Sequence, residues 1–407
     1  YEMCGRDWSS DVCSSDLGMV GYVTSHLCLD KEREEWERKS PAPPKRIASP
    51  KDIMIEAPIG AASFNNEFGR PCITGFFRTY EDNDETHWGY LKPIMIAGGI
   101  GNIYDEHVIK KQGKAGDKIY VLGGPGMLIG MGGGAASSLA SGSSDEDLDY
   151  ASVQRGNAEM QRRAQEVIDC CTSMEDKNPI ICIHDVGAGG LSNAVPEIVD
   201  HCGLGAKISL RSIPIDEKGM SPMQIWCNES QERYVILISK DHVDLFESLC
   251  KRERCPFADI GELTKEKNLI LYDELFDNCP IDIPMSLLLG NTPRMQRKTN
   301  IIQETLSAKD DAHPEFKQAI HSVLKFPAVC SKNFLVTIGD RTVGGLIARD
   351  QLVGPWQVPV ADAGVSMRGF FTDEGEAIST GEKVSLANIN PRASARMALS
   401  ESILNII

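Results

Sequence analysis

His184 and Asp185 end the short apolar run "IICIHD" and are followed at once by "VGAGGLSNA". Neighbouring strand residues point to opposite faces, which predicts that the two side chains cannot act together on one atom. Asp185 is expected at the carboxyl end of a strand, before a glycine turn and a helix, where α/β proteins often bind ligands. A carboxylate there suits Mg²⁺, and a turn or capping aspartate is the structural alternative. His184 on its own is better explained as a structural histidine.

A second polar cluster, "QIWCNESQERY", precedes the apolar run "YVILIS". Carboxylate, amide and hydroxyl oxygens gathered at a strand entrance suit magnesium together with a polar or phosphorylated substrate. Polar turns before strands are also common, and the sequence leaves that alternative open. The candidate residues in the cluster are Gln224, Asn228, Glu229, Ser230 and Gln231.

The longest glycine-rich stretch, "VLGGPGMLIGMGGGAASS", follows a predicted strand. It matches GxGxxG imperfectly and lacks the acidic partner of a dinucleotide site, and the chain has no GxxxxGK[ST] motif. A different phosphate-binding loop or a structural turn both remain open. Gln154 and Arg155, just before a predicted helix, indicate either a substrate clamp or an ordinary helix entry.

Composition excludes several classes of protein. The net charge of −16 disfavours binding to nucleic acid or to acidic membranes, because both carry the same sign of charge. No stretch approaches the roughly 20 apolar residues that a membrane span needs. The 13 cysteines lack zinc-ligand spacing, which indicates reduced thiols in a cytoplasmic protein.

Strands and helices alternate along the chain, which predicts an α/β or α+β layered fold. Ser49 is a plausible N-cap and Pro50 a first helical residue for a helix that continues to Phe68. Further helices are predicted at 157–174, 187–203 and 391–407, and strands at 18–29, 72–80, 92–103, 115–124, 179–185, 233–241 and 333–340.

The first residues, 1–17, read "YEMCGRDWSSDVCSSDL" and have neither the charge nor the apolar core of a signal peptide. They resemble the translated read-through of a sequencing adapter, so we expect them not to be native. Turn residues after a long structured stretch predict a domain boundary near residue 295.

Several stretches in order along the chain resemble the large form of phosphoribosylformylglycinamidine synthase. They are "APIGAASFNNEFGRP", "KPIMIAGGIGN", "GGGAASS", "LDYASVQRGN", "IHDVGAGGLSNA", "IWCNESQERY" and "ARDQLVGPWQVPVAD". The family is a carbon–nitrogen ligase of purine biosynthesis: ATP phosphorylates the amide oxygen of formylglycinamide ribonucleotide, and ammonia derived from glutamine then displaces phosphate from the iminophosphate. Positioning and charge neutralisation supply most of such catalysis, with magnesium holding the phosphates.

The resemblance implies roles for individual residues. It makes Asp185, Asn228 and Gln224 the metal ligands, with Gln224 standing where an acidic ligand is expected. It assigns substrate contacts to Gln154 and to Glu229, Ser230 and Gln231. Phosphate or nucleotide contacts would come from Gly132, Gly133, Gly134 and His184. The resemblance places the catalytic residues outside this chain.

The resemblance also implies a PurM-like tandem repeat of N-terminal-like and C-terminal-like ATP-binding domains, incomplete at both ends. Residues 18–103 would end a first N-terminal-like domain, 104–295 would form the C-terminal-like domain, and 296–407 would begin the repeat. The glutaminase domain that supplies ammonia would lie elsewhere, so the fragment is expected to be inactive alone. Two alternatives are a catalytically silent ATP-fold interaction module and another synthetase of the superfamily, such as aminoimidazole ribonucleotide synthetase.

Overall fold

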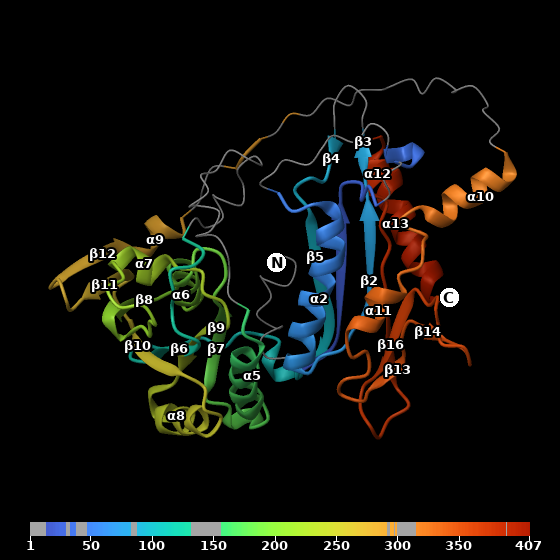
Figure 1. The fold of residues 1–407 in the computed structure, drawn as a ribbon. Helices are drawn as coiled ribbons and strands as arrows, with labels where there is room; N and C mark the ends of the chain where they lie inside the picture. Colours follow the sequence, from blue (N-terminus) through green and yellow to red (C-terminus); the bar gives the residue numbers. More distant parts are fainter. Residues whose placement is uncertain are drawn as a thin grey trace.

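The computed structural model describes residues 14–29, 33–37, 47–82, 88–131, 156–290, 294–296, 298, 315–387 and 389–407. Its described strands form separate sheets along the chain (Figure 1). None of the described helices is long and apolar enough to cross a bilayer.

The N-terminal sheet has the strand order β2-β1-β5, with β1 parallel to β2 and antiparallel to β5. Helix α2 packs against β1 and β2. It begins and ends as the sequence predicts: Ser49 Oγ accepts the Asp52 amide hydrogen at 3.1 Å, and Gly69 closes the helix with φ 90°. The elements are β1 Ser14–Thr24, α2 Pro50–Phe68, β2 Cys72–Thr79, β3 Glu81–Asp82, β4 Trp88–Gly89 and β5 Ile94–Asn102.

Strand β1 begins before the predicted residue 18. Ser14 pairs with Asn102 of β5, and Leu17 pairs with Ile100. Main-chain pairing of this kind depends little on side-chain identity, so residues excluded from the sequence-based prediction still extend the strand.

The central sheet has the order β12-β11-β8-β10-β6-β9-β7. Its elements are β6 Lys118–Gly123, α5 Ala158–Thr172, β7 Ile180–Asp185, α6 Leu191–His201, β8 Gly205–Ser209, α7 Pro222–Cys227, β9 Arg233–Ile238, α8 Val243–Arg252, β10 Phe257–Thr264, β11 Asn268–Asp273, β12 Asn278–Pro284 and α9 Met285–Leu288.

Alternation along the central strands builds two cores. In β6, Ile119 and Val121 belong to the core that contains α6, whereas Tyr120 and Leu122 belong to the core that contains α5 and α8. Strand β9 is buried at every position because helices cover both faces of the sheet. This layered arrangement confirms the predicted α/β fold.

The C-terminal elements pack against the N-terminal sheet rather than against the central one (Figure 1). Strands β16 and β17 contact β2, and helix α11 contacts α2. The elements are α10 Phe316–Lys325, α11 Asn333–Ile338, β13 Ile347–Arg349, β14 Leu352–Val353, β15 Val358–Pro359, β16 Ala363–Met367, β17 Gly375–Ser379, α12 Val384–Ala387 and α13 Pro391–Ile406.

The predicted strand at 333–340 is wrong, because the segment "NFLVTI" forms helix α11. A short apolar run does not distinguish a strand from a buried helical turn. The tertiary contact decides the outcome, because α11 packs against α2, and Leu335 and Val336 line a cavity together with Ala61 and Ala62 of α2.

We expect Ser49→Ala to destabilise the first turn of α2 by about 1 kcal/mol, because the Asp52 amide loses its side-chain acceptor. Hydrogen exchange at residues 52–55 should accelerate roughly fivefold. Ser49→Thr keeps a hydroxyl at the N-cap that can accept from the Asp52 amide and donate to the Asp52 carboxylate, so it serves as the control and should exchange like the wild type. Equal exchange in all three proteins would show that the cap contributes nothing.

Candidate functional site

Three loops meet at one edge of the central sheet. They are the loop 124–131 after β6, the turn 186–190 after β7, and the loop 228–232 before β9. The strand register brings them together, because Gly123 at the end of β6 pairs with Arg233, and Asp185 at the end of β7 pairs with Tyr234. Residues more than 100 positions apart in sequence therefore border the same small region, which we call the three-loop site.

Arg233 holds the loop 228–232 in place. Its side chain is buried, with 2% exposure. Nε donates to the Ser230 carbonyl at 2.9 Å, and Nη2 donates to the main-chain and side-chain oxygens of Asn228 at 2.9 and 2.8 Å. Because a buried guanidinium requires hydrogen-bond acceptors, the loop directs these oxygens toward Nε and Nη2. The sequence analysis did not select Arg233, although a charged residue at the head of a buried strand was an available signal.

Asn228 is completely buried and caps the C-terminal end of α7. Its amide nitrogen donates to the carbonyls of Gln224 and Ile225 at 2.8 and 2.9 Å. Its amide oxygen accepts from Arg233. The side chain therefore terminates α7 and anchors the loop at the same time.

Glu229 joins the three loops. Its Oε1 accepts the Gly189 amide hydrogen at 2.7 Å, and its own amide donates to the Ile129 carbonyl at 3.1 Å. The next residue repeats the pattern, because Ser230 Oγ accepts the Met127 amide hydrogen at 2.9 Å. Both side chains are almost fully buried. In this arrangement they position the backbone.

Gln231 and Glu232 complete the loop. Gln231 is half-buried, and its amide nitrogen donates to the Glu229 carbonyl at 3.3 Å. Glu232 has φ 57°, a left-handed conformation unusual for a residue other than glycine, and its carboxylate accepts the Asn157 amide hydrogen at 2.9 Å. Because Asn157 caps α5, the loop also fixes where that helix begins.

Gly190 is required by a close approach of backbone. It has φ 63°, and a Cβ added there would lie 2.2 Å from the Asn228 carbonyl oxygen. Gly189 has φ 80°, but its Cβ would meet ordinary contacts, the nearest being 3.4 Å from Asn193 Cβ. The glycine pair in "GAGG" thus contains one residue that needs only a left-handed backbone and one that also needs empty space.

His184 and Asp185 are closer than the sequence analysis predicts. Nδ1 of His184 lies 3.7 Å from Asp185 Oδ1 and 2.7 Å from the Asp185 carbonyl oxygen. The expectation that strand alternation separates them is wrong, because Asp185 is the last residue of β7 and the backbone turns there. Nε2 of His184 faces Glu197 Oε2 of α6 at 2.5 Å, which fits the structural role expected for this histidine.

The three expected metal ligands do not assemble a magnesium site in this arrangement. Asn228 Oδ1 faces the guanidinium of Arg233, which would repel a cation. Gln224 Oε1 accepts the Ser221 amide hydrogen at 2.8 Å in a capping box. Asp185 keeps a carboxylate that is 43% exposed. Within the described part of the chain, no group of three His, Cys, Asp or Glu residues could hold a metal ion.

Four expected site residues, Gly132, Gly133, Gly134 and Gln154, lie outside the described residues. Nearby, the described glycine Gly130 has φ 68°, and a Cβ added there would lie 2.4 Å from Glu229 Cβ. The start of the glycine-rich stretch therefore packs directly on the three-loop site.

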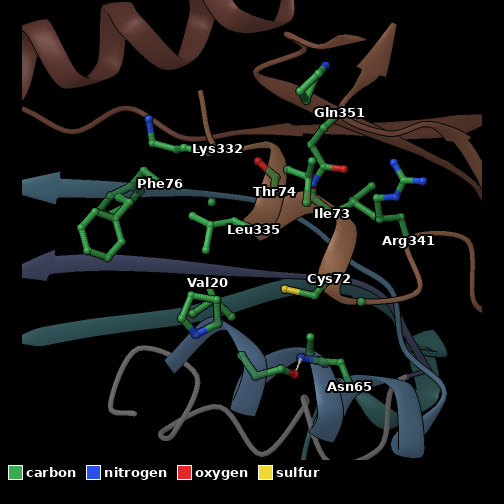
Figure 2. A pocket seen from close by; sticks show the side chains of 18 of the residues that line it. Val20, Asn65, Cys72, Ile73, Thr74, Phe76, Lys332, Leu335, Arg341 and Gln351 are labelled. Atoms are coloured by element: carbon green, nitrogen blue, oxygen red, sulfur yellow. Dashed lines mark hydrogen bonds between the residues drawn. The ribbon is translucent and has the colours of Figure 1, made fainter. Parts of the chain in front are cut away.

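A cavity of about 220 Å³ lies between the N-terminal sheet and the C-terminal elements (Figure 2). Apolar side chains from β2 and α11, such as Phe76 and Leu335, line it together with the polar side chains Thr74 and Arg341. Lys332 also lines it, and burial lowers the pKa of its ammonium group. None of the expected site residues that the structure describes borders this cavity. The sequence analysis missed it because its walls come from segments about 260 residues apart in the chain.

The two glycines of the turn offer a matched test of the site. We expect Gly189→Ala to cost about 1–2 kcal/mol through backbone strain alone. Gly190→Ala adds an overlap with the Asn228 carbonyl and should cost about 1–3 kcal/mol more. Hydrogen exchange at residues 187–190 and 228–230 measures the difference. If both variants exchange alike, the close approach of the two loops is not present in solution.

Two domain families match the chain. "AIR synthase related protein, C-terminal domain" matches residues 114–274, which cover most of the central sheet. "FGAR-AT PurM_N-like domain" matches residues 331–407, from α11 to α13.

Solved structures of PurL from Thermotoga maritima share the fold across the chain. The structure complexed with FGAR aligns with a TM-score of 0.67 and 21% identity, covering 98% of this chain and 56% of the other. The structure complexed with ADP aligns with a TM-score of 0.63 and 20% identity, over 98% and 54%. The structure of phosphoribosylformylglycinamidine synthase II aligns with a TM-score of 0.62 and 19% identity, over 98% and 55%. The chain thus spans about half the length of these proteins, and the likeness confirms the expected PurM-like fold. By its two matched domain families and its fold, the chain resembles part of a phosphoribosylformylglycinamidine synthase of the PurL type.

Proposed function

We propose that the chain forms part of the synthase portion of a phosphoribosylformylglycinamidine synthase in purine biosynthesis. The observation that carries the proposal is the three-loop site, where the Asp185 turn and the loop 228–232 meet in a fold like that of PurL structures complexed with FGAR and with ATP. The substrates would be formylglycinamide ribonucleotide, ATP and ammonia derived from glutamine. The proposed location is the cytoplasm, since the described cysteines are free thiols.

In this proposal the residues of the site divide into two roles. Glu229 and Ser230 are buried against main-chain amides, so they position the loops. Asp185 and Gln231 are more exposed and are the residues that contact ligand. Glu229 and Ser230 accept hydrogen bonds from the amides of Gly189 and Met127, and we infer that this fixed backbone orients a phosphorylated substrate.

Magnesium enters the proposal only as part of magnesium-ATP, and no step is assigned to a protein-bound ion. Of the three expected ligands, only Asp185 presents an oxygen that is not directed at a hydrogen-bond donor of α7 or at Arg233. The same observation favours the second candidate function, a catalytically silent ATP-fold module.

An activity assay separates the two candidates. The full gene product containing this sequence is supplied with formylglycinamide ribonucleotide, ATP and ammonium chloride, and ADP release is measured. We expect Asp185→Asn to lower the rate by about 10²-fold, as the loss of one preorganised charge does in other enzymes. The matched control is Asp200→Asn, at the exposed far end of α6, and it should stay within about twofold.

Two outcomes would contradict the proposal. If Asp185→Asn released ADP at the wild-type rate, Asp185 would have no role in binding or converting the substrates. A wild-type protein that binds ATP in a calorimetric titration but releases no ADP in the presence of both other substrates would support the silent module.

A further inference from the structure

The cavity between the N-terminal sheet and the C-terminal elements has the features of a binding site of its own. Its volume of about 220 Å³ lies below the roughly 300–1,000 Å³ that drug-sized ligands occupy, so it fits a molecule of about one ring. Gly75, Asp340 and Asp362 are exposed lining residues, so the cavity reaches the protein surface. No residue of the three-loop site lines it.

Apolar side chains contribute the larger part of the walls. Val20 comes from β1, Phe76 from β2, and Leu335 from α11 (Figure 2). Water molecules against such walls would make few hydrogen bonds, whereas an apolar ring would remove surface from water. The walls therefore favour an organic occupant with an apolar body.

One end of the cavity carries two buried polar atoms without a hydrogen bond. They are Oε1 of Gln351 and Nη1 of Arg341. Both belong to the same end, because Nη1 of Arg341 lies 3.4 Å from Oδ2 of Asp350, the residue next to Gln351. Figure 2 shows the two side chains beside Ile73, with Lys332 at the opposite side. Buried polar atoms normally have a partner, so a ligand is expected to supply it.

The protein itself fixes the orientation of Gln351. Its Nε2 donates to the Ile73 carbonyl, which can only accept, so the amide oxygen is the atom left without a partner. Polar groups elsewhere in the walls are paired within the chain, as Lys332 shows by donating to the Cys330 carbonyl at 3.1 Å. Among the described lining residues, the buried unpaired atoms are thus those of Gln351 and Arg341.

The two atoms require different partners, since Oε1 needs a donor and Nη1 needs an acceptor. A carboxamide supplies both from neighbouring atoms. A carboxylate would place a lone pair against Oε1, and an ammonium group would place a positive charge against the guanidinium. The charged residues among the described walls also balance, with Lys332 and Arg341 against Asp340 and Asp362, which favours a ligand without net charge.

We propose that the cavity is a ligand site for a small neutral carboxamide carried on an apolar ring. The carboxamide oxygen accepts from Nη1 of Arg341, its NH₂ group donates to Oε1 of Gln351, and the ring lies against Phe76 and Leu335. The bound molecule connects the N-terminal sheet with α11, because the walls come from both. The site does not depend on the activity proposed for the three-loop site.

Titration of the wild-type chain with benzamide tests the proposal without a variant. The methyl NMR signals of Val20, Leu335 and Val336 report on the cavity. We expect these signals to shift with benzamide. We also expect benzamide to bind about tenfold more tightly than benzoate, which has the same ring but no donor. Unchanged methyl signals, or equal affinity for the two compounds, would overturn the proposal.

One variant then tests the polar end of the cavity. Arg341→Met removes the donor and keeps a long side chain, so the affinity for benzamide should fall about tenfold. Arg349→Met is the matched control, because Arg349 is exposed and does not line the cavity, and it should bind benzamide like the wild type. Melting curves verify that both variants fold. Wild-type affinity in Arg341→Met would show that the carboxamide does not bind at this end.

Discussion

The three-loop site depends on one buried charge, the guanidinium of Arg233. A cation removed from water requires hydrogen-bond acceptors, and Nε and Nη2 of Arg233 donate to the carbonyls of Ser230 and Asn228 and to the amide oxygen of Asn228. These contacts hold the backbone of the loop 228–232 at Asn228 and Ser230. Its side chains at Glu229 and Ser230 then meet the amides of Gly189 and Met127.

This constraint changes how the polar cluster "NESQ" is understood. The residue types alone suit metal and substrate ligands, but the oxygen of Asn228 is directed at a cation, and the carboxylate of Glu229 at a main-chain amide. The polar atoms of the motif are largely used to hold three loops in register. Asp185 and Gln231 belong to the same loops and are more exposed. Polar residues that look catalytic in sequence can be the supports of a site.

The sequence by itself determined the elements whose signals are local. Ser49, Pro50 and Gly69 delimit α2, and alternation or apolar runs identify β6, β7 and β9, because caps and side-chain periodicity act over a few residues. It also indicated that the segments near Asp185 and Asn228 are special. Only the tertiary structure decided that residues 333–338 form a helix and that His184 Nδ1 lies 3.7 Å from Asp185 Oδ1. It also decided which groups donate hydrogen bonds to the side-chain oxygens of Asn228 and Gln224. These features depend on partners distant in sequence, on the register of β6, β9 and β7, and on the need to satisfy a buried charge, none of which is visible in a local pattern.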